Sequence, residues 1–329
     1  MKERIIYMDV ARAFAILIAY LGHILAYQIP GTVPTNIILS YSPTASMSLL
    51  AFISAILVTP KNHIITNTMM TKRILRIYLP MLLCLVITFT FSRVNSPWGY
   101  DPVHVLFHAL GLSLFFDLFS VPNNAGIGYG LWFVTTIVIM YLTLPIQIKL
   151  FHHRNGLLHL VIIFIFCFLM KVYLKNDSSP WSVITGFSFG VYLSVKNRID
   201  SATQISLPIT VTLLLMITIA SYISIVKNIT WIIPLLTPVY PLVMLSFFRR
   251  ICKFTPSFIL KAMCFFSLIS YEFYILQFSF INTQLTKLIK TDGLISHVTI
   301  SFSILIFLSY VTNKVAEVMI KKSNAYIGS

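Results

Sequence analysis

Charged residues are scarce in this 329-residue chain, and acidic residues are the scarcest of them. Asp, Glu, Lys and Arg together make up 10% of the chain, whereas 57% of the residues are hydrophobic. A soluble domain of this length could not bury so much apolar surface, so the composition excludes a water-soluble fold and predicts several membrane-spanning helices. The apolar runs are continuous over about 20 residues instead of alternating, which disfavours a β-barrel.

Cysteine is also rare, and acids are far outnumbered by bases. The four cysteines show no CxxC or Cys/His spacing, so we expect neither disulfides nor a structural metal. The 24 Lys and Arg residues against 9 Asp and Glu give a net charge of +15, which could suggest nucleic acid. The basic residues cluster in short loops between apolar runs, however, and positive-inside topology explains that pattern better. We expect the lipid bilayer, and not nucleic acid, as the partner.

Eleven apolar runs organise the chain into what we predict to be one integral-membrane domain over residues 1–329, with no cleaved signal peptide and no appended soluble domain. The runs fall near 9–28, 37–59, 77–93, 103–120, 129–149, 157–174, 180–195, 205–226, 230–248, 260–283 and 295–317. If 103–120 crosses the membrane, the basic loop around Arg154 falls outside. If it does not cross, basic residues favour the cytoplasmic side roughly threefold. We predict an all-α polytopic fold with about ten transmembrane helices and both termini in the cytoplasm.

The run at 103–120 differs from the others because it is less uniformly apolar. It carries His104, His108 and Asp117 and precedes the polar turn at 122–126. These features favour a non-spanning amphipathic or re-entrant helix on the outer face. His104 and His108 are four residues apart and could bind a metal, but no third ligand is near in the sequence. An interfacial helix face is the better interpretation, and we expect no metal.

Three ionisable residues lie on one stripe of the first predicted span: Asp9, Arg12 and His23. Eleven residues at about 100° each separate Arg12 from His23, so both side chains point to nearly the same face, about 16 Å apart along the axis. Asp9 is one turn before Arg12. A bilayer tolerates such groups poorly, so the stripe predicts a polar interior where function should be sought. The structural alternatives are an Asp9–Arg12 ion pair and a His23 that only bonds a neighbouring helix.

Two further elements add polar groups to the predicted membrane domain. Arg73 and Arg76 are three residues apart at the cytoplasmic start of the third span. Positive-inside anchoring would explain them, but together with Arg12 they could form a pocket for phosphates. Glu272 lies near the middle of the ninth span, where we expect it to be neutral or paired. A hydrogen bond to a neighbouring helix is the default for Glu272, and a place in the site is the alternative.

Several motifs, in their order and spacing, resemble the integral-membrane acyltransferase 3 family over nearly the whole chain. They are Asp9-x-x-Arg12 with His23, Arg73-x-x-Arg76, Gly130-Leu-Trp132-Phe…Tyr141-Leu…Pro145, and Ile269-Ser-Tyr-Glu272-Phe-Tyr274-Ile-Leu276. Many members have a His just after the last motif. This chain has Gln277 there, which puts any role of that second His in question.

The resemblance implies an O-acetyltransferase of the bacterial cytoplasmic (inner) membrane that moves acyl groups, usually acetyl, from cytoplasmic acyl-CoA to extracytoplasmic polysaccharides. Arg73 and Arg76 would hold the donor's phosphates, with Arg12 as a possible third group. His23 would act as general base or carry the acyl group. Asp9 would orient Arg12 through a charge-assisted hydrogen bond.

The resemblance also implies that the sugar acceptor approaches from the outer side. Trp132 and Tyr129 offer aromatic faces for sugar rings there, and Glu272 is a further candidate. Two other function classes compete with the enzyme. An exporter of a glycan or lipid-linked intermediate should have helices broken by Gly or Pro at matching positions of its two halves. The candidate helix-breaking residues are not at matching positions; they are Gly186, Gly190, Pro234, Pro238 and Pro241. A structural subunit would leave the intramembrane ionisable stripe without a purpose.

Overall fold

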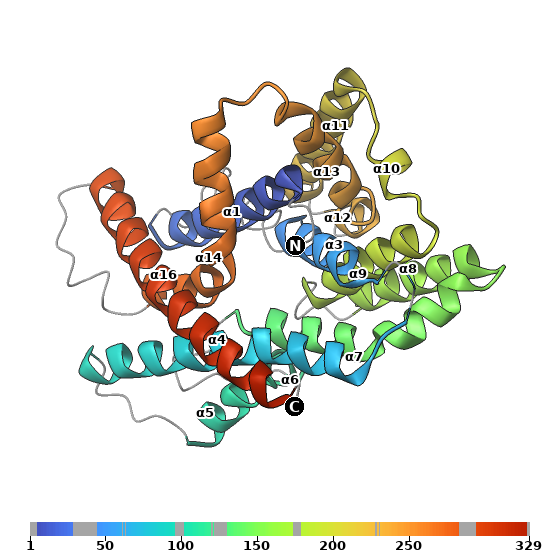
Figure 1. The fold of residues 1–329 in the computed structure, drawn as a ribbon. Helices are drawn as coiled ribbons and strands as arrows, with labels where there is room; N and C mark the ends of the chain where they lie inside the picture. The colour runs from blue at the N-terminus through green and yellow to red at the C-terminus, as the bar shows by residue number, and fades with distance from the viewer. Residues whose placement is uncertain are drawn as a thin grey trace. The chain divides into compact units, whose positions relative to one another are not determined.

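Helices are the regular structure of this protein, seen in a computed structural model (Figure 1). The described residues are 5–28, 45–60, 62, 64–95, 102–119, 121, 130–173, 179–227, 229, 231–282 and 294–327. No strand occurs within these ranges. The predicted all-α class is therefore confirmed.

Within the described residues, seven helices are long and apolar enough to cross a membrane. They are α1 (Ile6–Gln28), α4 (Asn67–Asn95), α7 (Trp132–His152), α8 (Gly156–Tyr173), α11 (Leu207–Val226), α14 (Ser257–Asn282) and α16 (Leu294–Ile327). At about 1.5 Å per residue, each is near or above the thickness of a hydrocarbon core. The chain is thus a multi-pass membrane protein, as predicted.

Three other predicted spans fall on shorter helices. The run 37–59, partly outside the described residues, contains α3 (Met47–Val58), and 180–195 coincides with α9 (Ser179–Val195). The run 230–248 is divided into α12 (Ile232–Leu236) and α13 (Tyr240–Ile251). Prolines at and around the break cannot donate a backbone N–H, which explains the interruption. The count of ten spans and the side of the termini stay predictions.

The run at 103–120 forms two short helices, α5 (Pro102–Ala109) and α6 (Ser113–Leu118), instead of one. Gly111 lies between them with φ +71°, a conformation that favours glycine. Tyr78 Oη donates to the Leu110 carbonyl at 2.8 Å, and Thr135 Oγ1 donates to the Gly111 carbonyl at 2.5 Å. Each helix is too short to span a bilayer alone. The predicted outer location of this segment stays a prediction.

The chain divides into two compact units, and α1, α7 and α14 contribute to both. Unit 1 comprises the described parts of Met1–Gly22, Gly31–Ile65 and Ile139–Leu268. Unit 2 comprises those of His23–Pro30, Thr66–Val138 and Ile269–Ser329. Neither unit is one continuous stretch of chain. The prediction of one domain over 1–329 stays a prediction.

The close packing of α3 against α9 forms the centre of unit 1. A Cβ added at Gly186 would overlap the carbonyl oxygen of Ser48, and one at Gly190 would lie 2.6 Å from the Phe52 carbonyl oxygen. Two small residues four apart let the helix backbones approach closely, as membrane helices often do. α8 packs against α9, α13 against α3, and α11 against α13.

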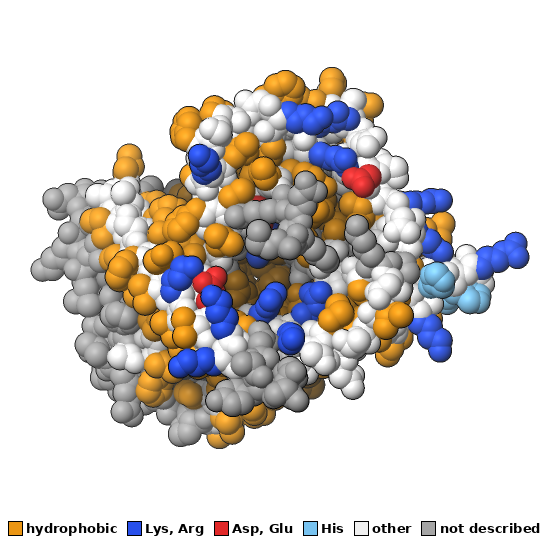
Figure 2. Space-filling view, viewed as in Figure 1, with side chains coloured by type: hydrophobic (Ala, Val, Ile, Leu, Met, Phe, Trp, Pro, Cys, Tyr) orange, Lys and Arg blue, Asp and Glu red, His pale blue; other side chains and the backbone are white. Residues whose placement is uncertain are grey.

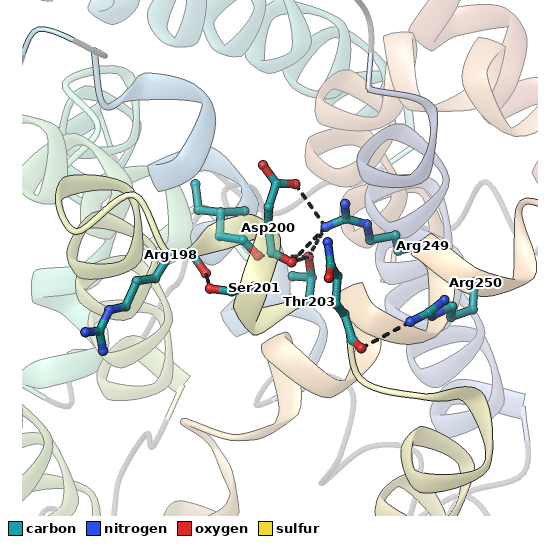
Figure 3. A network of polar contacts seen from close by, with 8 residues as sticks. Arg198, Asp200, Ser201, Thr203, Arg249 and Arg250 are labelled. Carbon is teal, nitrogen blue, oxygen red and sulfur yellow. Dashed lines mark hydrogen bonds and ion pairs between the residues drawn. The ribbon is translucent and has the colours of Figure 1, made fainter.

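The connection between α9 and α11 is fixed by two arginines at the end of α13 (Figure 3). It contains the short helix α10 (Ile199–Ala202). The Arg249 guanidinium lies 3.0 Å from Asp200 Oδ1 and donates to Thr203 Oγ1 at 2.6 Å. Arg250 Nη2 donates to the Gln204 carbonyl at 3.1 Å. These basic residues have structural partners within unit 1.

Unit 2 is built around α4, with α16 packed along it and α14 joined to it by a hydrogen bond. Tyr271 Oη of α14 donates to the Ile77 carbonyl of α4 at 2.9 Å. Pro80 of α4 lies in the next turn and lacks an N–H, so the helix ladder is weakened beside this contact. Side-chain hydroxyls therefore supplement the helix–helix packing in this unit.

Surface side chains agree with a membrane setting. Large apolar side chains on α8 and α11 are exposed, among them Leu157, Ile162, Ile165, Ile209, Leu215 and Ile219. Figure 2 shows hydrophobic side chains spread across one face, with Lys and Arg far more numerous there than Asp and Glu. Exposed apolar helix faces are what a lipid bilayer solvates.

Candidate functional site

Asp9 and Arg12 interact on the first turns of α1 in unit 1. Arg12 Nη1 lies 3.9 Å from Asp9 Oδ1, and Ser267 Oγ donates to the same oxygen at 3.2 Å. The Arg12 side chain is 34% exposed and that of Asp9 is 15% exposed. The carboxylate is held by α14 while its partner keeps an accessible guanidinium. This arrangement suits an arginine that is oriented for an anionic or carbonyl group.

His23 lies on the same unbroken helix, eleven residues after Arg12. The continuity of α1 preserves the helical phase that places both residues on nearly one face. His23 is half-buried and belongs to unit 2, whereas Arg12 belongs to unit 1. An imidazole at this depth is a group that can accept and return a proton.

Arg73 and Arg76 lie in the second and third turns of α4, in unit 2. Arg73 is half-buried and Arg76 is exposed, and their spacing of three puts them on one face. Two guanidinium groups on one helix face are suited to phosphate oxygens. That these two residues share a pocket with Arg12 of unit 1 stays a prediction.

Trp132 is the first residue of α7 and is partly exposed. The turn before it contains Gly130, with φ +81°, whose carbonyl accepts a hydrogen bond of 2.7 Å from Tyr274 Oη of α14. The rings of Phe133 and Tyr274 also meet edge to face, 5.5 Å apart. The start of α7 is therefore fixed to α14. Tyr129, the other predicted aromatic residue, lies outside the described residues.

Glu272 is 2% exposed in α14, and its Oε1 accepts a hydrogen bond from Asn313 Nδ2 of α16 at 3.0 Å. A bond to a neighbouring helix is the default expected of a buried carboxyl in a span, and Asn313 supplies one. Glu272 and Asn313 belong to the same unit. The proposed alternative, that Glu272 contributes to substrate binding, stays a prediction.

His104 and His108 take part in packing within unit 2. The His104 ring stacks on Phe116 at 4.6 Å between centroids, and His108 Nδ1 lies 2.8 Å from Ser113 Oγ. No group of three His, Cys, Asp or Glu residues in the described ranges is placed to hold a metal ion. The two rings join α5 to α6.

Some motif residues are architectural, a role that local sequence does not reveal. Tyr141 Oη lies 2.6 Å from Ser54 Oγ, which links α7 to α3 in unit 1. Tyr274 links α14 to α7 in unit 2. Hydrophobic and hydroxyl character at these positions was visible in the sequence, but their partners are 87 and 144 residues away.

Comparison with known proteins gives one match. The family model described as an acyltransferase domain, that of the acyltransferase 3 family, matches residues 5–314. No curated protein and no solved structure matches the chain.

Proposed function

We propose, because this chain belongs to the acyltransferase 3 family, that it transfers acetyl from cytoplasmic acetyl-CoA to a hydroxyl of an extracytoplasmic envelope polysaccharide. The family assignment and the seven long apolar helices make it a multi-pass membrane acyltransferase. The single observation that carries the proposal is that the match extends over 5–314, nearly the whole chain. The bacterial cytoplasmic (inner) membrane is the location that fits such a donor and acceptor.

The donor end of the proposed site is basic. Acetyl-CoA carries phosphates at one end and a thioester at the end of a long pantetheine arm. Arg73 and Arg76 would hold the phosphates through charge-assisted hydrogen bonds, and their placement on one face of α4 supports that role. Arg12 would contribute a third guanidinium, oriented by Asp9, whose carboxylate is itself held by Ser267.

The chemical step needs a base that activates the sugar hydroxyl and a thioester carbonyl that the hydroxyl can attack. The sugar hydroxyl oxygen would attack the thioester carbonyl carbon, so that a carbon–oxygen bond forms and the carbon–sulfur bond breaks. His23 would take the hydroxyl proton and return it to the departing sulfur of coenzyme A. Transient acylation of His23 is the alternative route to the same products. Trp132, at the start of α7, would present an aromatic face to the sugar.

The proposal is tested by reconstituting the purified protein in liposomes. Acetyl-CoA labelled in the acetyl group is supplied on one side, and surface polysaccharide stripped of O-acetyl groups by mild alkali on the other. We expect alkali-labile label on the polysaccharide and one free thiol of coenzyme A for each ester formed. Movement of glycan without thiol release would instead identify an exporter and would overturn the proposed transfer.

A further inference from the structure

The side-chain amide of Gln277 is buried without the hydrogen bonds that usually replace those to water. It is fully buried in α14, yet neither Nε2 nor Oε1 has a hydrogen-bond partner among the described residues. A buried amide that forms no hydrogen bond destabilises the folded protein, and an apolar residue of similar size would avoid that cost. Polar groups of this kind are retained in functional sites, where a ligand supplies the missing partners.

Gln277 is close, along α14, to a residue that contacts the start of α7. It follows Tyr274 by three residues, or about 4.5 Å along α14. Tyr274 donates to the Gly130 carbonyl and contacts Phe133, so this part of α14 lies against the first turn of α7. Trp132 belongs to that same turn and is partly exposed. All of these residues belong to unit 2.

We propose that Gln277 binds the sugar acceptor. A carboxamide offers a carbonyl oxygen that accepts and an amide nitrogen that donates, side by side, which matches two neighbouring hydroxyl groups of a pyranose. An aromatic face such as that of Trp132 would add stacking to the hydrogen bonds of the amide. This inference rests on the proposed function, and it assigns Gln277 to acceptor binding and not to proton transfer.

The pantetheine arm of the donor also contains amides that Gln277 could bind. The contacts of Tyr274 with Gly130 and Phe133 favour the acceptor, because Tyr274 is three residues from Gln277. Tyr271, which bonds the Ile77 carbonyl beside Arg76, is six residues away. The experiment distinguishes the two ligands, because removing the amide should change the Michaelis constant of only the ligand that Gln277 binds.

The test uses Gln277→Met, which keeps the length and approximate volume of the side chain and removes both polar atoms. Two quantities are measured on reconstituted protein: the melting temperature without substrates, and kcat/KM for de-O-acetylated polysaccharide and for acetyl-CoA. We expect the melting temperature to rise by about 2 °C or more. We expect kcat/KM for the polysaccharide to fall by about tenfold, mainly through KM, while the KM for acetyl-CoA is unchanged.

Gln147→Met is the matched control, because Gln147 is also buried and its Oε1 also lacks a partner among the described residues, but its Nε2 donates to Thr143 Oγ1 at 3.1 Å. Its melting temperature should rise less than that of Gln277→Met, and its polysaccharide KM should match that of the wild type. A lower melting temperature in Gln277→Met would show a structural amide and overturn the inference. So would a changed KM for acetyl-CoA with an unchanged KM for polysaccharide. Wild-type protein that acetylates no polysaccharide would instead overturn the proposed function itself.

Discussion

The two units of the molecule differ in the closest contacts between their helices. In unit 1, α9 approaches α3 so closely that a Cβ on Gly186 or Gly190 would meet backbone oxygen. In unit 2, hydroxyl groups donate to backbone carbonyls of other elements, as Tyr274 does to Gly130 and Tyr271 to Ile77. Unit 2 also contains most of the proposed site residues, namely His23, Arg73, Arg76, Trp132, Glu272 and Gln277.

This difference separates substitutions that should affect folding from those that should affect binding. The close approach of the α3 and α9 backbones leaves no space for added atoms, so larger side chains at Gly186 or Gly190 should unfold the protein. Hydroxyl-to-carbonyl bonds are individually modest, so unit 2 should tolerate their loss with a smaller effect on stability. Polar groups of unit 2 should then be separable into those that bind substrate and those that hold helices.

Gly186→Val should have the largest effect on stability. The new Cβ would overlap the Ser48 carbonyl, which belongs to the backbone of α3 and cannot move aside as a flexible side chain can. We expect a loss of about 3 kcal/mol or more in folding stability, measured as the melting temperature in detergent. Thr218→Val, at an exposed position of α11, is the control. An unchanged melting temperature in Gly186→Val would remove the close-packing description of unit 1.

Replacing both Arg73 and Arg76 with Gln should weaken acetyl-CoA binding without unfolding unit 2. Each charge-assisted hydrogen bond to phosphate is worth about 1.5–3 kcal/mol, so affinity should fall about a hundredfold or more, and by less at high salt. Binding is measured with labelled acetyl-CoA on purified protein. Lys321 and Lys322, exposed near the end of α16, provide a control double Gln variant with the same loss of charge. Normal affinity with reduced yield would indicate membrane anchoring instead.

Tyr274→Phe should have a moderate effect. The substitution keeps the ring contact with Phe133 but leaves the Gly130 carbonyl without its donor. We expect a loss of about 1–2 kcal/mol in the melting experiment. The bond of Tyr78 to Leu110 is exposed, so Tyr78→Phe should cost less. Equal losses in both variants would argue against a special role of the Tyr274 contact.

The smallest expected effect concerns the chemistry of Cys252, just after α13. Burial raises the pKa of its thiol to about 11, with a smaller contribution from Cys264. Only the thiolate reacts with maleimide, so labelling should be slow at pH 7.5 and its rate should rise with pH up to about 11. The measurement uses a variant with Cys264→Ser. A half-maximal rate near pH 8.5 would show a thiol that is not shielded.

The long helices of the fold could be read from the sequence, because a continuous apolar run of about 20 residues fixes both helix and membrane. The break within 103–120 could not be read from the sequence, because one glycine with positive φ, Gly111, does not interrupt the apolar run. The short lengths of α3, α12 and α13 could not be read from the sequence either. Hydropathy averages over a window and does not register where a proline or glycine ends a helix.

Candidate residues within one helix could also be inferred, because helical spacing puts Asp9 next to Arg12. The partners of these residues from other helices could not. Ser267 is 258 residues from Asp9, and Asn313 is 41 residues from Glu272. Such pairs depend on how helices pack, which a single sequence does not specify. The unpartnered state of Gln277 belongs to the same class of information.

The catalytic role of His23 is tested by measuring acetyl transfer with His23→Ala protein in liposomes. With labelled acetyl-CoA and de-O-acetylated polysaccharide, we predict no alkali-labile label on the polysaccharide, although the protein is inserted and melts as the wild type does. His297→Ala is the matched control, since His297 is a buried histidine of α16 in the same unit, and it should retain transfer. Transfer by His23→Ala at the wild-type rate would contradict the role of His23 in catalysis.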